Sequence, residues 1–285
     1  MSGLNASLAY FLGVVIFAAV VRLLLKKWPS FGFILEFASS FMLVACRLEV
    51  QTIVEVGEWA GGLGPDVTVT ILFVVLLTHG VICGATGNPN LAILRFLQLE
   101  ATTLSTLAAV AALFLGAHVA LLVAGYYWSL ELTDMHMIKN LMARECSTSL
   151  LVSLLQGSFT ECVCALIFHL IQLNLHRRHA LIRVPLIAVL LTFLSYTARG
   201  YTSAYVNPSL AYGLTFFCSG FTWAEYTLVY WLGSFTGMTL ALFLYMGHIP
   251  RIFSQNLLYS QKTRFRVPKG ESSPEVLEVL RAHGE

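Results

Sequence analysis

Two Asn-Pro pairs, Asn88-Pro89 and Asn207-Pro208, each stand at the beginning of a short apolar stretch. Asparagine is a strong N-cap and proline is favoured as the first helical residue, so each pair predicts a helix that begins abruptly. Each stretch has roughly ten residues, about 15 Å of helix, which is half the thickness of a bilayer core. Such a helix can enter a membrane but cannot cross it.

The N-terminus of such a helix exposes free backbone N–H groups and carries about half a positive charge. Two of these ends facing one aqueous path repel cations and protons without any charged side chain. The two asparagines can cap their helices and still offer an N–H to a passing oxygen atom. The sequence therefore predicts two pore motifs, which are Asn88, Pro89 and Asn90 in the first half and Asn207, Pro208 and Ser209 in the second.

Two glutamates, Glu36 and Glu161, lie inside apolar runs upstream of the two Asn-Pro pairs. A carboxylate inside a membrane is costly unless it is paired or hydrogen-bonded. Because the two glutamates are placed alike, we expect each to support a loop by accepting N–H groups from its non-helical backbone. Proton or cation handling is the alternative role.

Composition indicates the class of protein that holds these residues. Of the 285 residues, 57% are hydrophobic and only 11% are charged, whereas soluble domains carry about 25% charged residues. The apolar runs are about 20 residues long, the length at which a helix crosses a bilayer. The prediction is an all-α integral membrane protein with apolar runs at 5–25, 31–50, 66–84, 101–126, 151–174, 182–199 and 224–246.

The two halves of the chain echo each other. Each half has a span with a glutamate, a second span, an Asn-Pro half-helix and a third span. Three spans per half give the halves opposite orientations, as in inverted-repeat transporters. We therefore predict a bundle of six spans plus two re-entrant half-helices, with an additional N-terminal apolar helix. Its parts are the N-terminal helix and linker 1–30, the channel domain 31–246 (repeats 31–126 and 151–246) and a tail 247–285.

The positive residues predict the orientation, because loops rich in Lys and Arg stay in the cytosol. The loop 51–65 has no Lys or Arg and contains Glu55 and Glu58. The segment 174–183 and the tail after 247 are basic. We expect the acidic loop on the lumenal or extracellular side and the C-terminus in the cytosol.

Other chemistry finds no support in the sequence. The cysteine spacing does not suggest a zinc site, and each cysteine is interpreted as an inert small side chain. No nucleophile–base pair, metal-ligand set or nucleic-acid motif is recognisable. We expect no enzymatic activity, no cofactor, no metal and no nucleic acid. The cysteines are Cys46, Cys83, Cys146, Cys162, Cys164 and Cys218.

The paired half-helices and paired membrane glutamates resemble the aquaporin, or major intrinsic protein, family over about residues 31–246. The usual family motif is Asn-Pro-Ala, but here Asn90 and Ser209 take the third positions. This departure resembles the superaquaporin branch, whose marker is a cysteine nine residues beyond the second motif, and Cys218 fits it. The stretches GEWAGGLGPD and VYWLGSFTGM resemble one member of that branch.

The resemblance implies a homotetramer in the lipid bilayer with one pore per subunit, in intracellular membranes such as endoplasmic reticulum or vesicles. Typical members carry an Arg directly after the second motif, where this chain has Leu210. Counting from the asparagines places Thr68, Ser195 and Ala204 at the other constriction positions, where a water-selective member has Phe and His at the first two. The implied constriction is neutral and wide, for water and small neutral solutes such as glycerol or hydrogen peroxide.

Two alternatives stay open at this point. The altered motifs also fit an aquaporin-fold protein that conducts poorly and has a structural role in an organelle membrane. A seven-span receptor is the other, but the Asn-Pro-x-x-Tyr motif of receptors is missing. Here Tyr212 follows Asn207-Pro208 one residue too late, and a whole span comes afterwards.

Overall fold

The structure is a computed structural model that describes residues 3–25, 28, 31–59, 65–84, 86–142, 146 and 148–246. The chain divides into two compact units, Met1–Tyr245 and Met246–Glu285. The N-terminal helix thus belongs to the same unit as the rest of the bundle, and the predicted tail 247–285 lies outside the described residues.

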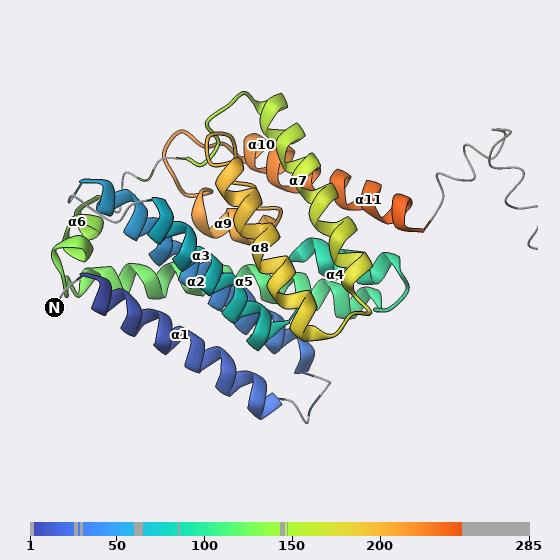
Figure 1. The fold of residues 1–285 in the computed structure, drawn as a ribbon, viewed down its shortest axis with the longest axis horizontal. Helices are drawn as coiled ribbons and strands as arrows, with labels where there is room; N and C mark the ends of the chain where they lie inside the picture. The colour runs from blue at the N-terminus through green and yellow to red at the C-terminus, as the bar shows by residue number, and fades with distance from the viewer. Residues whose placement is uncertain are drawn as a thin grey trace, which may run out of the picture. The chain divides into compact units, whose positions relative to one another are not determined.

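Long helices dominate the first unit (Figure 1), and the described residues form no strand. Among the residues that the structure describes, six helical passages are long and apolar enough to cross a membrane, and α2 is the long helix that is not one of them. The predicted all-α membrane bundle is therefore confirmed. The long passages are α1 (Gly3–Leu25), α2 (Gly32–Trp59), α3 (Pro65–Cys83), α5 (Thr103–Ser129), α7 (Leu154–Leu175), α8 (Ala180–Thr197) and a final passage of α10 (Trp223–Glu225), the π-helix η2 (Tyr226–Gly233) and α11 (Ser234–Tyr245).

Helix α2 differs from the prediction at its C-terminal end. It continues through the predicted loop 51–65 as far as Trp59. Its acidic residue Glu55 accepts hydrogen bonds from Gln51 Nε2 and Lys139 Nζ, both at 2.6 Å, so the charge is neutralised within the fold. Lys139 lies on α6 (Asp134–Met142), a short helix that the hydropathy pattern did not predict.

Two short helices interrupt the long ones. They are α4 (Pro89–Leu97) and α9 (Pro208–Leu214), with nine and seven residues. Each begins with proline at its first position and an asparagine N-cap in an extended conformation, as the sequence predicts. Both are too short to cross a bilayer core of about 30 Å.

The long helices pack as two similar halves, in which α2 lies against α5 and α7 against α11. Glycine allows the closest approach in each pair. A Cβ added to Gly116 of α5 would lie 2.4 Å from the Phe37 carbonyl oxygen, and one added to Gly237 of α11 would lie 2.1 Å from the Cys162 carbonyl oxygen. Phe37 and Cys162 directly follow the two membrane glutamates, so the same contact occurs once in each repeat.

Helix α1 packs along α2 and α3 (Figure 1), outside the two repeats. Its buried face repeats every four residues, which is the spacing of one helix face. Tyr127 of α5 donates a hydrogen bond of 2.8 Å to the Ala6 carbonyl oxygen near the start of α1. The opposite face is apolar and exposed, as expected for a helix against lipid. The buried face comprises Ala6, Tyr10, Val14 and Ala18, and the exposed face includes Leu8, Leu12, Ile16, Leu23 and Leu24.

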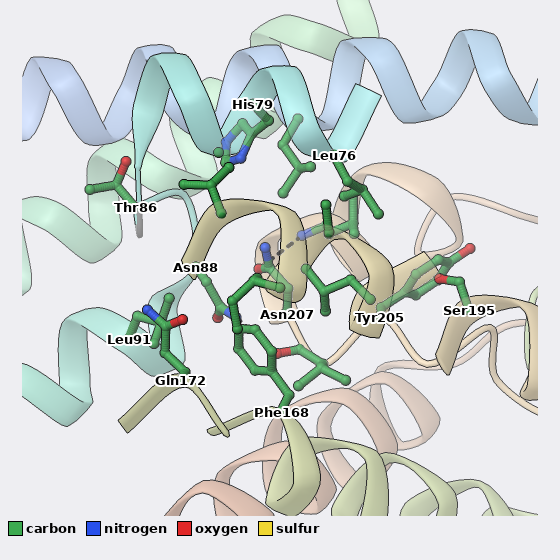
Figure 2. Close-up of a pocket in the computed structure, with 18 of the residues that line it drawn as sticks. Leu76, His79, Thr86, Asn88, Leu91, Phe168, Gln172, Ser195, Tyr205 and Asn207 are labelled. Atoms are coloured by element: carbon green, nitrogen blue, oxygen red, sulfur yellow. Dashed lines mark hydrogen bonds between the residues drawn. The ribbon is translucent and has the colours of Figure 1, made fainter. Parts of the chain in front are cut away.

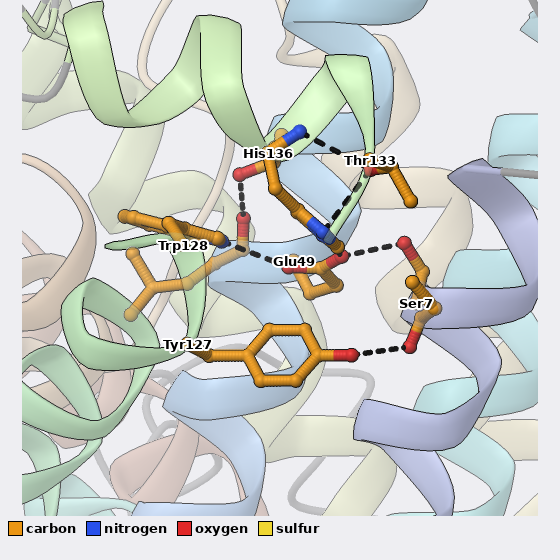
Figure 3. Close-up of polar contacts among 9 residues, drawn as sticks. Ser7, Glu49, Tyr127, Trp128, Thr133 and His136 are labelled. Carbon is orange, nitrogen blue, oxygen red and sulfur yellow. Dashed lines mark hydrogen bonds and ion pairs between the residues drawn. The ribbon is translucent and has the colours of Figure 1, made fainter. Parts of the chain in front are cut away.

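A buried carboxylate, Glu49 of α2, joins α1 and α6 to the bundle (Figure 3). Its Oε1 accepts a hydrogen bond from Ser7 Oγ at 2.5 Å and lies 2.8 Å from His136 Nε2. Its Oε2 accepts from Trp128 Nε1 at 2.9 Å. Because a buried charge must be hydrogen-bonded to be tolerated, this one residue couples the packing of four helices.

The glycine contact between α11 and α7 generates a stability prediction. Gly237→Ala should lower stability by about 1–3 kcal/mol, because the added methyl group meets backbone rather than a flexible side chain. Gly125→Ala on α5 is the control, since a Cβ there has nothing within 4 Å. Apparent melting temperatures of the detergent-solubilised protein, followed by tryptophan fluorescence, measure both. Equal melting temperatures for wild type and Gly237→Ala would contradict this packing.

Candidate functional site

The half-helices α4 and α9 meet at their N-termini through reciprocal hydrogen bonds. The Asn88 side-chain Nδ2 donates to the Val206 carbonyl oxygen at 3.0 Å, and the Asn207 Nδ2 donates to the Gly87 carbonyl oxygen at 2.8 Å. Each asparagine therefore binds the residue that precedes the other asparagine. Figure 2 shows the two side chains together at the centre of a cavity.

Each asparagine also caps its own helix. Asn88 Oδ1 accepts the Asn90 N–H at 2.9 Å, and Asn207 Oδ1 accepts the N–H groups of Ser209 and Leu210 at 3.1 and 3.3 Å. The caps satisfy backbone donors that would otherwise be unpaired. The asparagine oxygens point back to their own helices, while their amide nitrogens join the two repeats.

The third positions of both motifs make contacts that an alanine could not. Asn90 Nδ2 donates to Ser234 Oγ at 2.9 Å, which ties α4 to α11. Ser209 Oγ accepts from Ser40 Oγ at 3.4 Å, which ties α9 to α2. Both residues are fully buried. The departures from Asn-Pro-Ala thus act in helix packing.

The two glutamates face the loops before the asparagines. Glu36 Oε2 accepts the Gly87 N–H at 3.0 Å, and its Oε1 forms an ion pair with Arg95 of α4. Glu161 is fully buried, and its two oxygens accept the N–H groups of Tyr205 and Val206 at 3.0 and 2.8 Å. Both glutamates thus accept N–H groups from these loops, and Glu161 has no ion pair among the described residues.

The residue before each asparagine has a left-handed backbone. Gly87 has φ of 90°, and Val206 has φ of 52°. A β-branched residue in this region is strained by about 1–3 kcal/mol and persists only where its surroundings hold it. Glu161 accepts the Val206 N–H while Asn88 donates to its carbonyl oxygen, so both backbone polar groups of Val206 are held in place.

An inner cavity of about 100 Å³ passes the two asparagines (Figure 2). This space has room for several waters, since one water needs about 10–15 Å³. Figure 2 shows Thr86 and Gln172 on one side of the asparagines and Ser195 and Tyr205 on the other. Three of the predicted constriction residues line this cavity, namely Ser195, Ala204 and Leu210.

An outer cavity of about 260 Å³ lies beside the inner one. Thr68, the fourth predicted constriction residue, lines only this outer cavity, where Ser195 also lies. The two cavities share Arg47, Ser195 and Tyr205 in their walls. They therefore meet at these three residues, which come from α2, from α8 and from the loop before α9.

The sequence analysis missed Arg47, Tyr205, His79 and Gln172 as cavity residues. Arg47 lies inside an apolar run, and an ionisable residue at membrane depth is a functional candidate by default. The sequence therefore contained a signal that could have identified Arg47 as a cavity residue. The predicted constriction residues carry no charge, but the Arg47 guanidinium lines the same cavity as Ser195, Ala204 and Leu210. His79 is held by Ser39, whose Oγ lies 3.0 Å from His79 Nε2.

The interpretation of all cysteines as inert is wrong for two of them. Cys146 and Cys218 form a disulfide, whereas Cys46, Cys83, Cys162 and Cys164 are free. The bridge links the segment before α7 to the segment after α9, beside Thr148 and Ser149 of the outer cavity. Sequence alone could not pair them, because they are 72 residues apart.

Comparison with known proteins gives a consistent result. No protein-family profile matches the chain. The chain is 41% identical over 290 residues to aquaporin-12 of Mus musculus, with 100% of both chains covered. It is 27% identical over 257 residues to aquaporin-11 of Homo sapiens, covering 88% of this chain and 93% of that one. Aquaporin-12 is the member that the stretches at 57–66 and 229–238 resemble, so that resemblance is confirmed.

The fold is similar to the X-ray structure of the aquaglyceroporin from Plasmodium falciparum. The TM-score is 0.57 at 18% sequence identity, and the match covers 75% of this chain and 94% of that one. At this identity the likeness supports the fold alone.

The first prediction for the site concerns Glu161. Glu161→Ala leaves two buried N–H groups unpaired and should destabilise the protein by about 1–3 kcal/mol for each. Glu161→Gln keeps one acceptor oxygen and should lose about half as much. Melting in detergent should rank wild type above Gln and Gln above Ala, with the exposed Glu100→Ala as control. If Glu161→Ala melts like wild type, the glutamate does not support the loop.

The second prediction concerns the disulfide. Cys146→Ser and Cys218→Ser should each destabilise by about 2–4 kcal/mol, the usual contribution of a native disulfide. The double variant should lose no more than either single variant, because both remove one bond. A reducing agent should lower the melting temperature of wild type but not that of the double variant. Additive losses would show that the cysteines act separately.

Proposed function

Because the chain belongs to the aquaporin family of membrane channels, we propose that it is a passive channel for water and small neutral solutes such as glycerol or hydrogen peroxide. The path runs through the inner cavity, past Asn88 and Asn207, into the outer cavity. The observation that carries the proposal is the meeting of two half-helix N-termini, locked by reciprocal asparagine bonds, inside a cavity of an apolar bundle.

Selection against cations begins at this meeting point. The N-termini of α4 and α9 place partial positive charge beside the path, and this charge does not depend on any ionisable group. Asn88 and Asn207 remain slightly exposed, at 7% and 4%. Each amide has two N–H donors and uses one in the reciprocal bonds, so the second is available to a passing oxygen atom.

The predicted constriction residues supply little bulk to the path. Ser195, Ala204 and Leu210 carry no ring and no charge, and Thr68 stands apart in the outer cavity. Leu210 directly follows the second motif, where typical members carry Arg. We infer that the path is wide enough at this level for a polyol as well as for water.

We further propose that the end of the bundle holding Glu55, α6 and the disulfide faces the lumen or the extracellular space. Disulfides persist in oxidising compartments, and Arg177 and Arg178 lie in the loop between α7 and α8 at the opposite end of those helices. This orientation places the C-terminus in the cytosol. We also propose a homotetramer in intracellular membranes, such as endoplasmic reticulum or vesicles, as the resemblance to the superaquaporin branch implies.

A second candidate function is a poorly conducting protein with a structural role in an organelle membrane. The small inner cavity, and the use of both third motif positions for packing, favour this candidate. Stopped-flow measurements on proteoliposomes distinguish the two candidates by comparing fluxes of water, glycerol and hydrogen peroxide with those of protein-free vesicles. A wild-type protein with no flux above protein-free vesicles would favour the structural role.

Leu210→Arg tests the selectivity directly. The longer, charged side chain should narrow the inner cavity and reduce any glycerol flux more than water flux, since glycerol needs the greater width. Leu210→Met is the control, because it conserves volume and charge. Both fluxes are measured in the same vesicle preparation. Equal reductions of glycerol and water flux would contradict the proposed role of position 210.

A further inference from the structure

One cation stands where the two cavities meet. Arg47 lies on α2 within the apolar run 31–50 that the sequence predicts to span the membrane, and it lines both the inner and the outer cavity. Ser40 of α2 contacts Ser209 of α9. Arg47 comes seven residues after Ser40, which is about 10 Å along the helix axis. The guanidinium therefore lies beyond the asparagine pair, on the outer side of the path.

The Arg47 charge has no acidic partner among the described residues. The nearby acids on α2 are engaged elsewhere, because Glu49 binds Ser7, Trp128 and His136. Glu55 is held by Gln51 and Lys139. A charge inside a membrane is unfavourable unless it is paired or faces water, so a wet path is the environment that explains an unpaired Arg47.

An aromatic ring holds the guanidinium in position. The Arg47 Cζ lies 5.9 Å from the centre of the Tyr205 ring, within the range of a cation–π contact. Tyr205 is itself fixed, since its hydroxyl lies 2.6 Å from Ser149 Oγ and Glu161 accepts its N–H. The contact uses the ring face and leaves the N–H groups of Arg47 without a hydrogen bond to any side chain that the structure describes.

We call the point where the two cavities meet, lined by Arg47, Tyr205 and Ser195, the neck. Ser195, the third of these residues, has its hydroxyl donor occupied. Ser195 Oγ donates to the Ser203 carbonyl oxygen at 3.1 Å. Arg47 is therefore the residue at the neck with free donors, and a guanidinium has five N–H groups and no acceptor. It can bind the oxygen of water or of a neutral solute, and it repels any cation.

We propose that Arg47 is the charge-selective residue of the channel, set at the neck by Tyr205 and acting in place of an arginine after the second Asn-Pro motif. This assignment rests on the proposed channel function. The positive charge at the neck comes from Arg47 on α2 and not from a residue on α9. Leu210 on α9 leaves space beside the neck. Cation exclusion then has one source at the half-helix N-termini and another at the Arg47 guanidinium, beside the charges of Arg183 in the wall of the inner cavity and Arg199 in that of the outer one.

Variants of Arg47 in proteoliposomes test the proposal. Arg47→Gln and Arg47→Met both remove the charge, and Met keeps a long side chain without a polar group. Whichever of the two is monodisperse in detergent is used for the measurement. Arg47→Lys keeps the charge. Arg177→Gln is the matched control, because it removes an exposed arginine that lines neither cavity. Water flux is measured by stopped-flow scattering, and proton flux by a pH dye trapped in the same vesicles.

The uncharged variants should keep water flux within about twofold of wild type and raise proton flux at least about tenfold, because a unit charge a few ångström from a passing cation is a strong barrier. Arg47→Lys and Arg177→Gln should stay as proton-tight as wild type. If wild type conducts water and the uncharged variants stay proton-tight, the Arg47 assignment is wrong while the channel function stands. If wild type passes no water, the channel function fails and the assignment fails with it.

Discussion

The reciprocal bonds between the asparagines and the two loops are the interaction on which this structure depends. A helix that stops in the middle of a membrane leaves backbone groups without partners, and such groups are tolerated only when they are buried in protein or line a wet cavity. Here Asn88 and Asn207 each satisfy their own helix and the opposite loop at the same time. Neither half-helix is complete without the other, so the two repeats must fold together.

The two repeats surround the asparagine pair with the same kinds of contact, which occur once in each repeat. A glutamate supports each loop, and a glycine in each half lets two helices approach closely at the residue after that glutamate. Helix α1 stands outside this symmetry and is joined to it through Glu49. The added helix therefore changes the lipid-facing surface beside α2 and α3 without entering the path.

The departures from the usual motif become coherent when they are considered together. Asn90 and Ser209 use their side chains to bind neighbouring helices, which strengthens the packing of the half-helices. Leu210 removes a cation from α9, while Arg47 supplies one from α2 at the neck. Charge near the path is thus retained while its point of attachment changes.

The sequence by itself determined the membrane class, the half-helices at Asn88 and Asn207, the inverted repeat and the resemblance to the aquaporin family. These features are local or periodic, since hydropathy, capping and spacing can be read along one stretch of chain. It also contained Glu36 and Glu161 as candidates, because a carboxylate in an apolar run is conspicuous. Only the tertiary structure decided which N–H groups these glutamates accept, that Cys146 pairs with Cys218, and that Arg47 rather than Thr68 stands at the neck with Ser195 and Tyr205. Each of these depends on residues far apart in the chain, and their proximity arises only when the helices have packed.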